Sequence, residues 1–419
     1  MTSLIGDQQH PVRRSAGWET GQTNVRSRNV APTVAVATVA VLAVVAGAVL
    51  AARQGPGDGT NTAAPLPGAT PTSTPPTAIA KSSATPAPYS LSAPTPKPAV
   101  RVKLDLSKLP TGRTPQLSYL TGRVIRGGLG EDVTVPGEQN ILRAARVGGD
   151  RAYVVLEVGE GGAELAEAGF DASTTRIPDV QSLVSSMDED SVAFATAPSN
   201  PDNTRAKGSA VYWESTQTVG SRRKLDRPDD WGSAVLAVVG ETVFFKSDTH
   251  PDGLTSTLNS WNSATGNVTR IKSVRSPVGV GNSGKLAVDF VAGAAQTFCS
   301  TVNELADGKQ LWRTCEYAIA GFTPDGKTAI GTPDFRVGGS DPLVAALNSS
   351  SGAVQREWTG AQFLEVVAED DDHLLMVVDS GEGTPGGIIR CAIGTGGCEV
   401  ATPLAKTSRY ATRLLGAWT

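Results

Sequence analysis

The stretch GFTPDGKTAI, residues 321–330, decides the fold because it holds one complete turn between two strand-like runs. An apolar run ends at Phe322, the turn Pro-Asp-Gly follows, and an alternating run begins at Lys327. Proline and glycine supply the backbone angles of a tight turn, and alternation of apolar and polar side chains is typical of a half-buried strand. The stretch therefore predicts two antiparallel strands joined by a short turn.

Turns of this kind recur at intervals of about 40 to 50 residues, each between an apolar run and an alternating run. Further copies lie at 149–150, 188–190, 240–241, 282–284 and 370–372. A second turn, which contains glycine, comes about 20 to 30 residues after each first one, most clearly in NSATGNV at 262–268 and NSSSGAV at 348–354. A repeat of this length with two hairpin turns is typical of a β-propeller blade, which is a four-stranded antiparallel sheet.

These turns predict where the blades begin. We expect starts near residues 141, 181, 232, 275, 317 and 361. A seventh blade would form from residues 117–136 together with residues 410–418, because such closure by both ends removes the last free sheet edge. The composition, with 46 glycines, 27 prolines and only 5% aromatic residues, suits short strands and many turns. The predicted fold is all-β, a six- or seven-bladed propeller over residues 106–419.

Residues 30–52 form the longest uncharged apolar run of the chain. About 20 apolar residues suffice for a helix to cross a bilayer, so we expect a transmembrane helix here. Four arginines lie before it and only Arg53 follows closely, which by the positive-inside rule places residues 1–29 in the cytoplasm as a short tail. The expected location is the cell membrane, with a single span and an extracellular C-terminal domain. A cleaved signal peptide, ending near Ala46-Gly47-Ala48, is the alternative.

Residues 53–105 are dominated by proline, threonine, alanine and serine. Such a composition offers too little apolar surface to form a core, so we expect a disordered stalk that holds the folded domain away from the membrane.

The charge pattern argues against a nucleic-acid partner. The chain has a formal net charge of −4, and its lysines and arginines are not gathered into a run in the C-terminal part. A phosphate backbone is usually met by a concentrated basic surface. We therefore expect no nucleic-acid binding.

All four cysteines lie in the part of the chain that we expect to be exported. Cys391 and Cys398 flank a predicted hairpin tip, and Cys299 and Cys315 flank the turn at Asp307-Gly308 at nearly equal distances. Each pair would then face across neighbouring antiparallel strands. We predict two disulfides, 299 with 315 and 391 with 398, each worth about 2 to 3 kcal/mol in the chain-entropy model. A metal site built from the four thiols is the alternative, although no histidine accompanies them.

The chain resembles the actinobacterial membrane-anchored proteins with WD40-like or TolB-like propellers. The resemblance covers about residues 110–419, and GFTPDGK at 321–327 is its most typical piece. The Gly-His and Trp-Asp pairs of true WD40 blades are absent from this sequence. The resemblance implies a propeller fold and a scaffold role, and no reaction.

Several motifs suggest chemistry but coincide with predicted turns. The segment 279–284 matches the G-x-G-x-x-G pattern of dinucleotide sites, yet no helical pattern follows it. The acidic run 369–373 lacks the ligand spacing of a calcium loop. The segment 247–253 is only faintly similar to the Asp-box of sialidases. The chain contains only three histidines, so few residues could serve as the base of a Ser-His-Asp triad. We expect no catalytic, metal-binding or cofactor-binding residue.

These observations favour a protein that binds and does no catalysis. The expected partners are the lipid bilayer, through residues 30–52, and an extracytoplasmic protein or cell-wall ligand. The alternative is an extracytoplasmic propeller enzyme, a glycan hydrolase or lyase. Two carboxylates with shifted pKa values in one funnel would indicate the enzyme, and a flat surface with exposed aromatic residues would indicate the binding module.

Overall fold

The computed structural model describes residues 99–159, 161–169, 176–200, 204–218, 222–292, 298–333, 341–379, 385–406 and 411–416. This part of the chain contains strands β1 to β28 and two short 3-10 helices, η1 (Leu106–Lys108) and η2 (Thr216–Thr218). Neither is long and apolar enough to span a bilayer. The predicted tail at 1–29, the predicted span at 30–52 and the stalk up to residue 98 lie outside the described residues.

The described strands form six sheets, in which neighbours pair antiparallel except at β1. Three of the four-stranded sheets are β5 (Ile141–Val147), β6 (Arg151–Val158), β7 (Gly162–Gly169) and β8 (Ile177–Pro178); β9 (Val180–Ser185), β10 (Ser191–Thr196), β11 (Ser209–Ser215) and β12 (Arg223–Arg227); and β13 (Gly232–Val239), β14 (Thr242–Asp248), β15 (Ser256–Asn262) and β16 (Val268–Ile271). The other two are β17 (Pro277–Val280), β18 (Leu286–Ala292), β19 (Phe298–Glu304) and β20 (Gln310–Thr314); and β28 (Thr412–Leu414), β2 (Tyr119–Thr121), β3 (Val124–Arg126) and β4 (Val133–Thr134).

The remaining sheet has eight strands. Its path is β21 (Ala318–Phe322), β22 (Thr328–Thr332), β23 (Asp341–Asn348), β24 (Val354–Ala368), β25 (His373–Asp379), β26 (Gly387–Ala392) and β27 (Cys398–Val400), with β1 (Val100–Lys103) alongside β24. The long strand β24 pairs with β23 mainly through its first half and with β25 through its second. Gly360, at φ 93°, lies between the halves, and a Cβ there would come within 2.5 Å of the Leu104 carbonyl oxygen. Glycine therefore lets β24 pass from one four-stranded set to the next.

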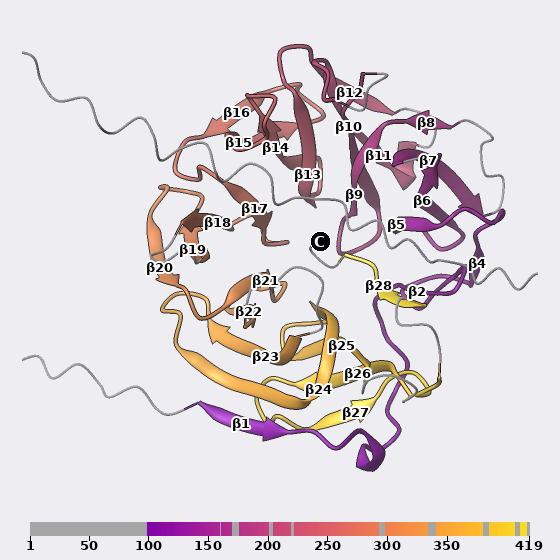
Figure 1. The fold of residues 1–419 in the computed structure, drawn as a ribbon, viewed down its shortest axis with the longest axis vertical. Coiled ribbons are helices and arrows are strands. Elements are labelled where there is room, and N and C mark those ends of the chain that lie inside the picture. The colour runs from indigo at the N-terminus through magenta and orange to yellow at the C-terminus, as the bar shows by residue number, and fades with distance from the viewer. Residues whose placement is uncertain are drawn as a thin grey trace, which may run out of the picture. The chain divides into compact units, whose positions relative to one another are not determined.

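The sheets are arranged around a common axis, and each turns its first strand toward the centre (Figure 1). This arrangement is a β-propeller, as the repeat predicts. The central strands β5, β9, β13, β17 and β21 begin at residues 141, 180, 232, 277 and 318, within a few residues of the predicted starts. The predicted turns join the first two strands of each set because they carry the residues that hairpins require.

One sheet is built from both ends of the described domain. Strand β28 pairs with β2, so that Tyr119 lies opposite Leu414 and Thr121 opposite Thr412. The pairing predicted between residues 117–136 and 410–418 is thus present in its central part. It closes the ring by hydrogen bonds between segments nearly 300 residues apart.

The predicted boundary of the stalk is wrong at its C-terminal end. Residues 100–103, which the sequence analysis assigned to a disordered segment, form β1 and pair in parallel with residues 356–359 of β24. Leu104 is buried in the adjoining hydrophobic cluster. The alternation Val-Arg-Val-Lys-Leu at 100–104 is typical of a strand, but the prediction for residues 53–105 was based on composition. The folded unit therefore begins before residue 106.

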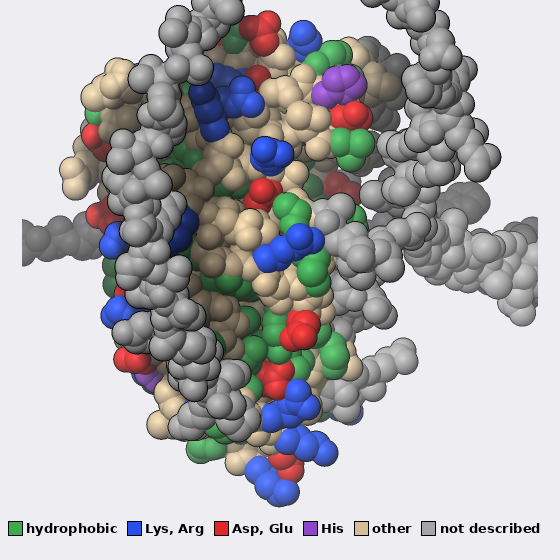
Figure 2. Space-filling model, turned by 90° about the vertical axis from the view of Figure 1, so that its left-hand side faces the viewer, with side chains coloured by type: hydrophobic (Ala, Val, Ile, Leu, Met, Phe, Trp, Pro, Cys, Tyr) green, Lys and Arg blue, Asp and Glu red, His purple; other side chains and the backbone are tan. Residues whose placement is uncertain are grey.

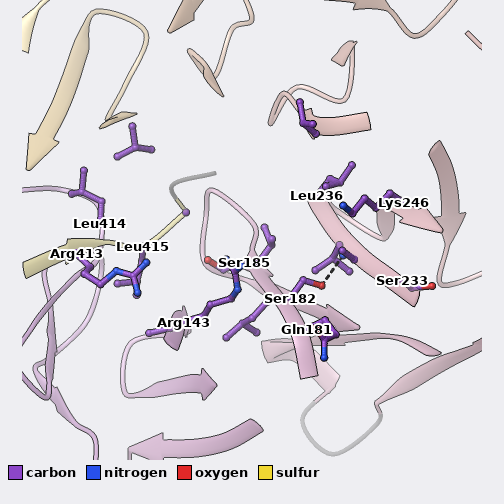
Figure 3. Close-up of a pocket in the computed structure, with 18 of the residues that line it drawn as sticks. Arg143, Gln181, Ser182, Ser185, Ser233, Leu236, Lys246, Arg413, Leu414 and Leu415 are labelled. Carbon is purple, nitrogen blue, oxygen red and sulfur yellow. Dashed lines mark hydrogen bonds between the residues drawn. The ribbon is translucent and has the colours of Figure 1, made fainter. Parts of the chain in front are cut away.

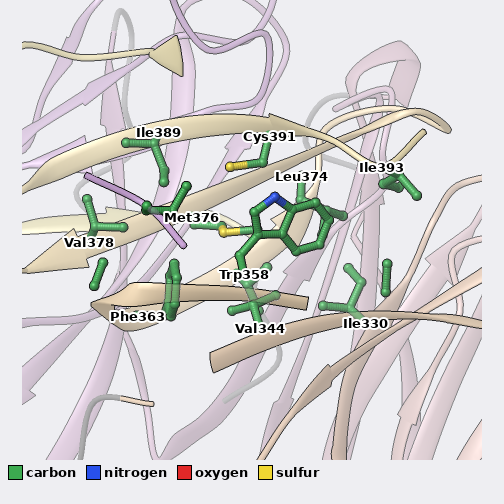
Figure 4. Packing of buried hydrophobic residues seen from close by; sticks show 14 of the residues in the cluster. Ile330, Val344, Trp358, Phe363, Leu374, Met376, Val378, Ile389, Cys391 and Ile393 are labelled. Carbon is green, nitrogen blue, oxygen red and sulfur yellow. The ribbon is translucent and has the colours of Figure 1, made fainter. Parts of the chain in front are cut away.

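Alternating side chains of facing sheets fill the spaces between them. In the largest cluster Trp358 is fully buried and packs with residues that include Val344, Met376 and Ile389, as Figure 4 shows. Strands such as HLLMVVD are apolar at nearly every position because both faces of the sheet are covered by neighbours.

Three tryptophans form the same contact between neighbouring sets of strands. The indole N–H groups of Trp213, Trp312 and Trp358 donate to backbone oxygens in turns of the next set along the chain, those of Gly240, Ser349 and Gly396, at 3.2, 2.6 and 3.3 Å. Each buried ring thereby satisfies its one polar group. These three tryptophans therefore serve packing between neighbouring sets of strands.

Both predicted disulfides are present. Cys299 is bonded to Cys315 and Cys391 to Cys398, and no free cysteine exists in the chain. Cys391 and Cys398 lie directly opposite each other on β26 and β27, as a hairpin requires. The alternative of a metal site at these thiols is therefore excluded.

Candidate binding cavity

A cavity of about 1180 Å³ lies between the central strands. Residues of β5, β9, β13, β21 and β28 line it, together with residues of the loops at their ends. Pockets for small molecules are usually about 300 to 1,000 Å³, so this one has room for a larger ligand. We call its two ends the loop end, near Gly232 and Asp248, and the turn end, near Ser186 and Glu189.

The cationic side chains that line the cavity come from strands and loops far apart in sequence. They are Arg143 on β5, Arg205 in the loop between β10 and β11, Lys246 on β14 and Arg413 on β28. Figure 3 shows Arg143 and Arg413 on one side of the cavity and Lys246 on the other. Among the described residues that line the cavity, the carboxylates are Glu189 and Asp248.

Arg413 also holds three sets of strands together. Its Nε donates to Glu365 on β24 at 2.9 Å, and its Nη1 donates to the backbone oxygen of Leu142 on β5 at 2.8 Å. The second carboxylate oxygen of Glu365 accepts from the Leu414 amide at 2.6 Å. The guanidinium is thereby fixed beside β5.

Arg143 shares this side of the cavity. Burial, together with the positive charge of nearby Arg413, lowers the pKa of Arg143 below its usual range. The carboxylate of Glu365 compensates part of the positive charge on this side of the cavity, because it is paired with Arg413.

Lys246 and Arg205 differ in their partners. Arg205 forms an ion pair with Asp248 at 2.5 Å, and Asp248 also accepts from the hydroxyl of Ser256 at 2.7 Å. The ammonium group of Lys246 forms no hydrogen bond or ion pair with the described part of the chain. The ammonium group of Lys246 is therefore available to a ligand.

The turn end carries Glu189, which is 7% exposed and has a left-handed backbone at φ 57°. Its Oε1 accepts from the Ser118 hydroxyl at 2.5 Å, and its Oε2 has no hydrogen-bond partner among the described residues. The fully buried Arg146 lies 3.9 Å from Oε2 and donates to Ser118 at 2.9 Å. Burial raises the pKa of Glu189, although Ser118 and Arg146 oppose the shift.

We expect Glu189→Gln to reveal this raised pKa. The folded protein holds the proton of Glu189 more tightly than the unfolded chain, so the contribution of Glu189 to wild-type stability falls as the pH rises from 4.5 through the raised pKa. Glutamine does not titrate. The difference in unfolding free energy, wild type minus variant, should therefore be largest below pH 4.5 and should shrink toward neutral pH. Urea unfolding followed by tryptophan fluorescence across this range measures it, and a constant difference would contradict the assignment.

Two residues of the motifs considered in the sequence line this cavity, Asn282 of the segment 279–284 and Asp248 of the segment 247–253. The G-x-G-x-x-G segment at 279–284 forms the turn between β17 and β18, where the amide of Gly281 donates to the Leu286 oxygen at 2.9 Å. In the acidic run 369–373, His373 contacts Asp370 at 2.9 Å within the turn between β24 and β25. No group of three or more metal-ligating side chains is gathered in the described ranges.

None of the cationic residues that line the cavity was singled out from the sequence, although the turn at 188–190 contains Glu189 and the segment 247–253 contains Asp248. Arg143 and Arg413 are 270 positions apart, and only ring closure brings their strands together. One signal was present: Arg143, Lys246 and Arg413 are charged residues inside segments that the pattern assigns to inner or closing strands. A charge in a strand that should be buried needs a partner or a ligand.

The side of the propeller seen in Figure 2 carries acidic and basic side chains interspersed with one another. No large surface of one charge is visible on its described atoms. The concentration of cations inside the cavity is thus distinct from the character of this outer surface.

Strand order, register and cavity define the class of protein, a β-propeller with a charged central cavity. No family model and no curated protein matches the chain. Among solved structures, TolB from Acinetobacter baumannii matches with a TM-score of 0.38 and 14% identity over 59% of this chain and 62% of that chain. The β-propeller domain of the Trilobed protease from Pyrococcus furiosus matches with a TM-score of 0.43 and 11% identity over 64% of this chain and 86% of that chain.

Prolyl oligopeptidase B from Galerina marginata matches with a TM-score of 0.46 and 9% identity, over 73% of this chain and 52% of that chain. The match therefore spans less than two thirds of the length of TolB and about half of the oligopeptidase. At these identities the matches assign no activity to this chain.

Proposed function

We propose that this chain is a membrane-anchored, extracytoplasmic propeller that binds a cell-envelope ligand in its central cavity without catalysis. In this proposal residues 30–52 cross the cell membrane and residues 1–29 lie in the cytoplasm. The propeller has seven blades, because β24 serves as the outer strand of one four-stranded set and the inner strand of the next. The two disulfides support an oxidising compartment for the domain.

The cavity is the observation that carries the binding function. It exceeds the usual volume of a small-molecule pocket, and its lining combines four cationic side chains with six serines. These groups come from several sets of strands that are held by ring closure. A rigid, polar and partly charged cavity of this kind is suited to ligand recognition.

The distribution of carboxylates favours binding over the alternative of a glycan hydrolase or lyase. Asp248 lies opposite Gly232, where β13 begins, whereas Glu189 lies in the turn between β9 and β10. Strands of six and eight residues separate the two ends, which corresponds to about 20 to 25 Å. Paired-carboxylate glycosidases hold their two carboxyl groups about 5 to 10 Å apart. This pair does not suit that reaction.

The test uses the full-length chain, purified in detergent, as bait for the polymer fraction of a cell-envelope extract. Mass spectrometry identifies both the retained material and any released fragments. We expect retention of intact polymer, loss of retention in Ala234→Trp, which fills the cavity, and normal retention in Val268→Trp on the outer strand β16.

Two results would overturn the proposal. Released fragments would establish that the protein is an enzyme, and equal retention by the two tryptophan variants would show that the cavity is not the binding site.

The anchor is tested separately: the full-length chain should sediment with membranes and resist extraction by alkaline carbonate, and deletion of residues 30–52 should release it. Release of the intact chain by carbonate would contradict the anchor.

A further inference from the structure

The two sides of the central cavity differ in polarity. The sets of strands that begin with β5 and β9 contribute serine hydroxyls, the amide of Gln181 and charged groups such as Arg143 and Glu189. The sets that begin with β17 and β21 contribute no charged side chain to the described lining. Their lining residues are mostly apolar: Val278, Phe290, Ala318, Ile319 and Ala320. A ligand that fits both sides is itself amphipathic.

The apolar side is built by one irregularity that recurs in three central strands. The pairing register shifts at Leu236 in β13, at Val278 in β17 and at Ala320 in β21, and each of these residues lines the cavity. A bulge re-aims the side chain of its extra residue, so the same irregularity presents apolar side chains from three successive sets to the cavity. We call Leu236, Val278, Phe290, Ile319 and Ala320 the apolar wall.

Part of the apolar wall is accessible although it packs on the core. Val278 and Phe290 pack against one hydrophobic cluster, and Leu236 and Ala320 pack against two others, but all four side chains are only partly buried. They line the cavity with the apolar surface that the core leaves uncovered. An alkyl chain that covers this surface removes it from water, which is favourable, and leaves no polar group of its own unpaired.

A cation lies beside the apolar wall. Lys246 is opposite Ala234 in the register of β13 and β14, and Ala234 is two residues from Leu236. Figure 3 shows Lys246 and Leu236 on the same side of the cavity. A lysine stem packs readily on apolar surface while its ammonium group seeks a polar partner.

The charge of Lys246 is not compensated by the lining. Its ammonium group forms no hydrogen bond or ion pair within the described ranges. Asp248, two positions further along β14, is already paired with Arg205, and Arg413 is paired with Glu365. A ligand carboxylate beside this ammonium group would form a charge-assisted hydrogen bond in a partly enclosed space.

We infer that the cavity binds a long-chain carboxylate, with its acyl chain on the apolar wall and its carboxylate beside the ammonium group of Lys246. The opposite side of the cavity, with its serine hydroxyls, stays hydrated in this arrangement. The inference rests on the proposed function, in which the cavity is the ligand site, and names the chemical class that this site recognises.

The test is photoaffinity labelling of the full-length chain in nanodiscs of zwitterionic lipid. Two probes carry the same mid-chain diazirine: hexadecanoate, and hexadecanol, which lacks the charge. Labelling is measured at about pH 9, where the carboxylic acid is ionised and lysine is still protonated (pKa about 10.4), and is normalised to the labelled lipid. We expect labelled sites in the apolar wall, with about tenfold more labelling by hexadecanoate than by hexadecanol.

Variants separate the effect of the charge from that of the chain. Lys246→Gln should lower labelling by hexadecanoate about tenfold and leave labelling by hexadecanol unchanged, whereas Lys246→Arg should keep most of it. Val278→Asn should weaken labelling by both probes, because it puts an amide on the apolar wall. Lys285→Gln is the matched control, because it removes the same charge from an exposed turn between β17 and β18.

Three results would overturn the inference: equal labelling of the apolar wall by the two probes, unchanged hexadecanoate labelling in Lys246→Gln, and labelled sites only outside the cavity. If one of these occurs while Ala234→Trp still abolishes polymer retention, the proposed function stands and the long-chain carboxylate is wrong. If Ala234→Trp also leaves polymer retention unchanged, both are wrong. A peptide ending in leucine with a free carboxylate that displaces the probe more strongly than unlabelled hexadecanoate would overturn the acyl assignment.

Discussion

Replacing Trp358 by alanine is expected to lower the free energy of unfolding by about 3 to 5 kcal/mol. The ring is completely buried in the largest hydrophobic cluster, and its indole N–H donates to the backbone oxygen of Gly396 at 3.3 Å. The variant loses the transfer free energy of the ring, leaves a cavity and deprives that oxygen of its donor. Urea unfolding monitored by far-UV circular dichroism measures the change.

The control is Trp231→Ala. Trp231 is the same residue type but only half-buried, with the Lys207 ammonium 5.5 Å from its ring centre. Its replacement should cost about 1 kcal/mol or less. Equal losses in the two variants would show that the space around Trp358 is not closely packed.

Breaking the ion pair between Arg390 and Glu369 is expected to destabilise the protein by about 3 to 5 kcal/mol. Both residues are buried, and Arg390 Nη2 donates to Glu369 Oε1 at 2.7 Å. The Gln116 amide also donates to this oxygen, at 2.6 Å, and Arg390 Nη1 donates to the Arg113 backbone oxygen at 2.8 Å. Glu369→Ala would remove the buried carboxylate, would leave the guanidinium with the partly exposed Glu399, 2.6 Å from Nη1, and would loosen the N-terminal segment.

Two further variants separate this cost from a general loss of charge. Lys327→Ala removes an exposed ion pair with Asp325, in which the lysine side chain is 84% exposed, and should change stability by less than about 1 kcal/mol. Replacing both buried partners, Glu369→Leu with Arg390→Met, should recover much of the loss, because no uncompensated charge stays buried. If the double variant is less stable than Glu369→Ala, the hydrogen bonds of Arg390 to backbone oxygens contribute more to the free energy of unfolding than the ion pair with Glu369 does.

The local elements of the fold could be predicted because each is encoded over a few residues. The turns at 324–326 and 282–284 and the hairpin of Cys391 and Cys398 all appear where the pattern places them. Hairpins depend on turn residues and on alternation in flanking strands, and both are visible in a short window. The strand β1 was missed because its short alternation follows a proline-rich segment, and its pairing partner lies more than 250 residues away.

The sequence by itself therefore determined the repeat, the class of fold and the two disulfides, since turn residues, alternating strands and paired hairpin cysteines are local properties of the chain. Only the tertiary structure decided which side chains meet. Arg143, Lys246, Arg413 and Glu189 share one cavity because strands from different sets approach a common axis. No spacing in the sequence encodes these contacts, because they depend on ring closure between β2 and β28 and on the register of every intervening strand.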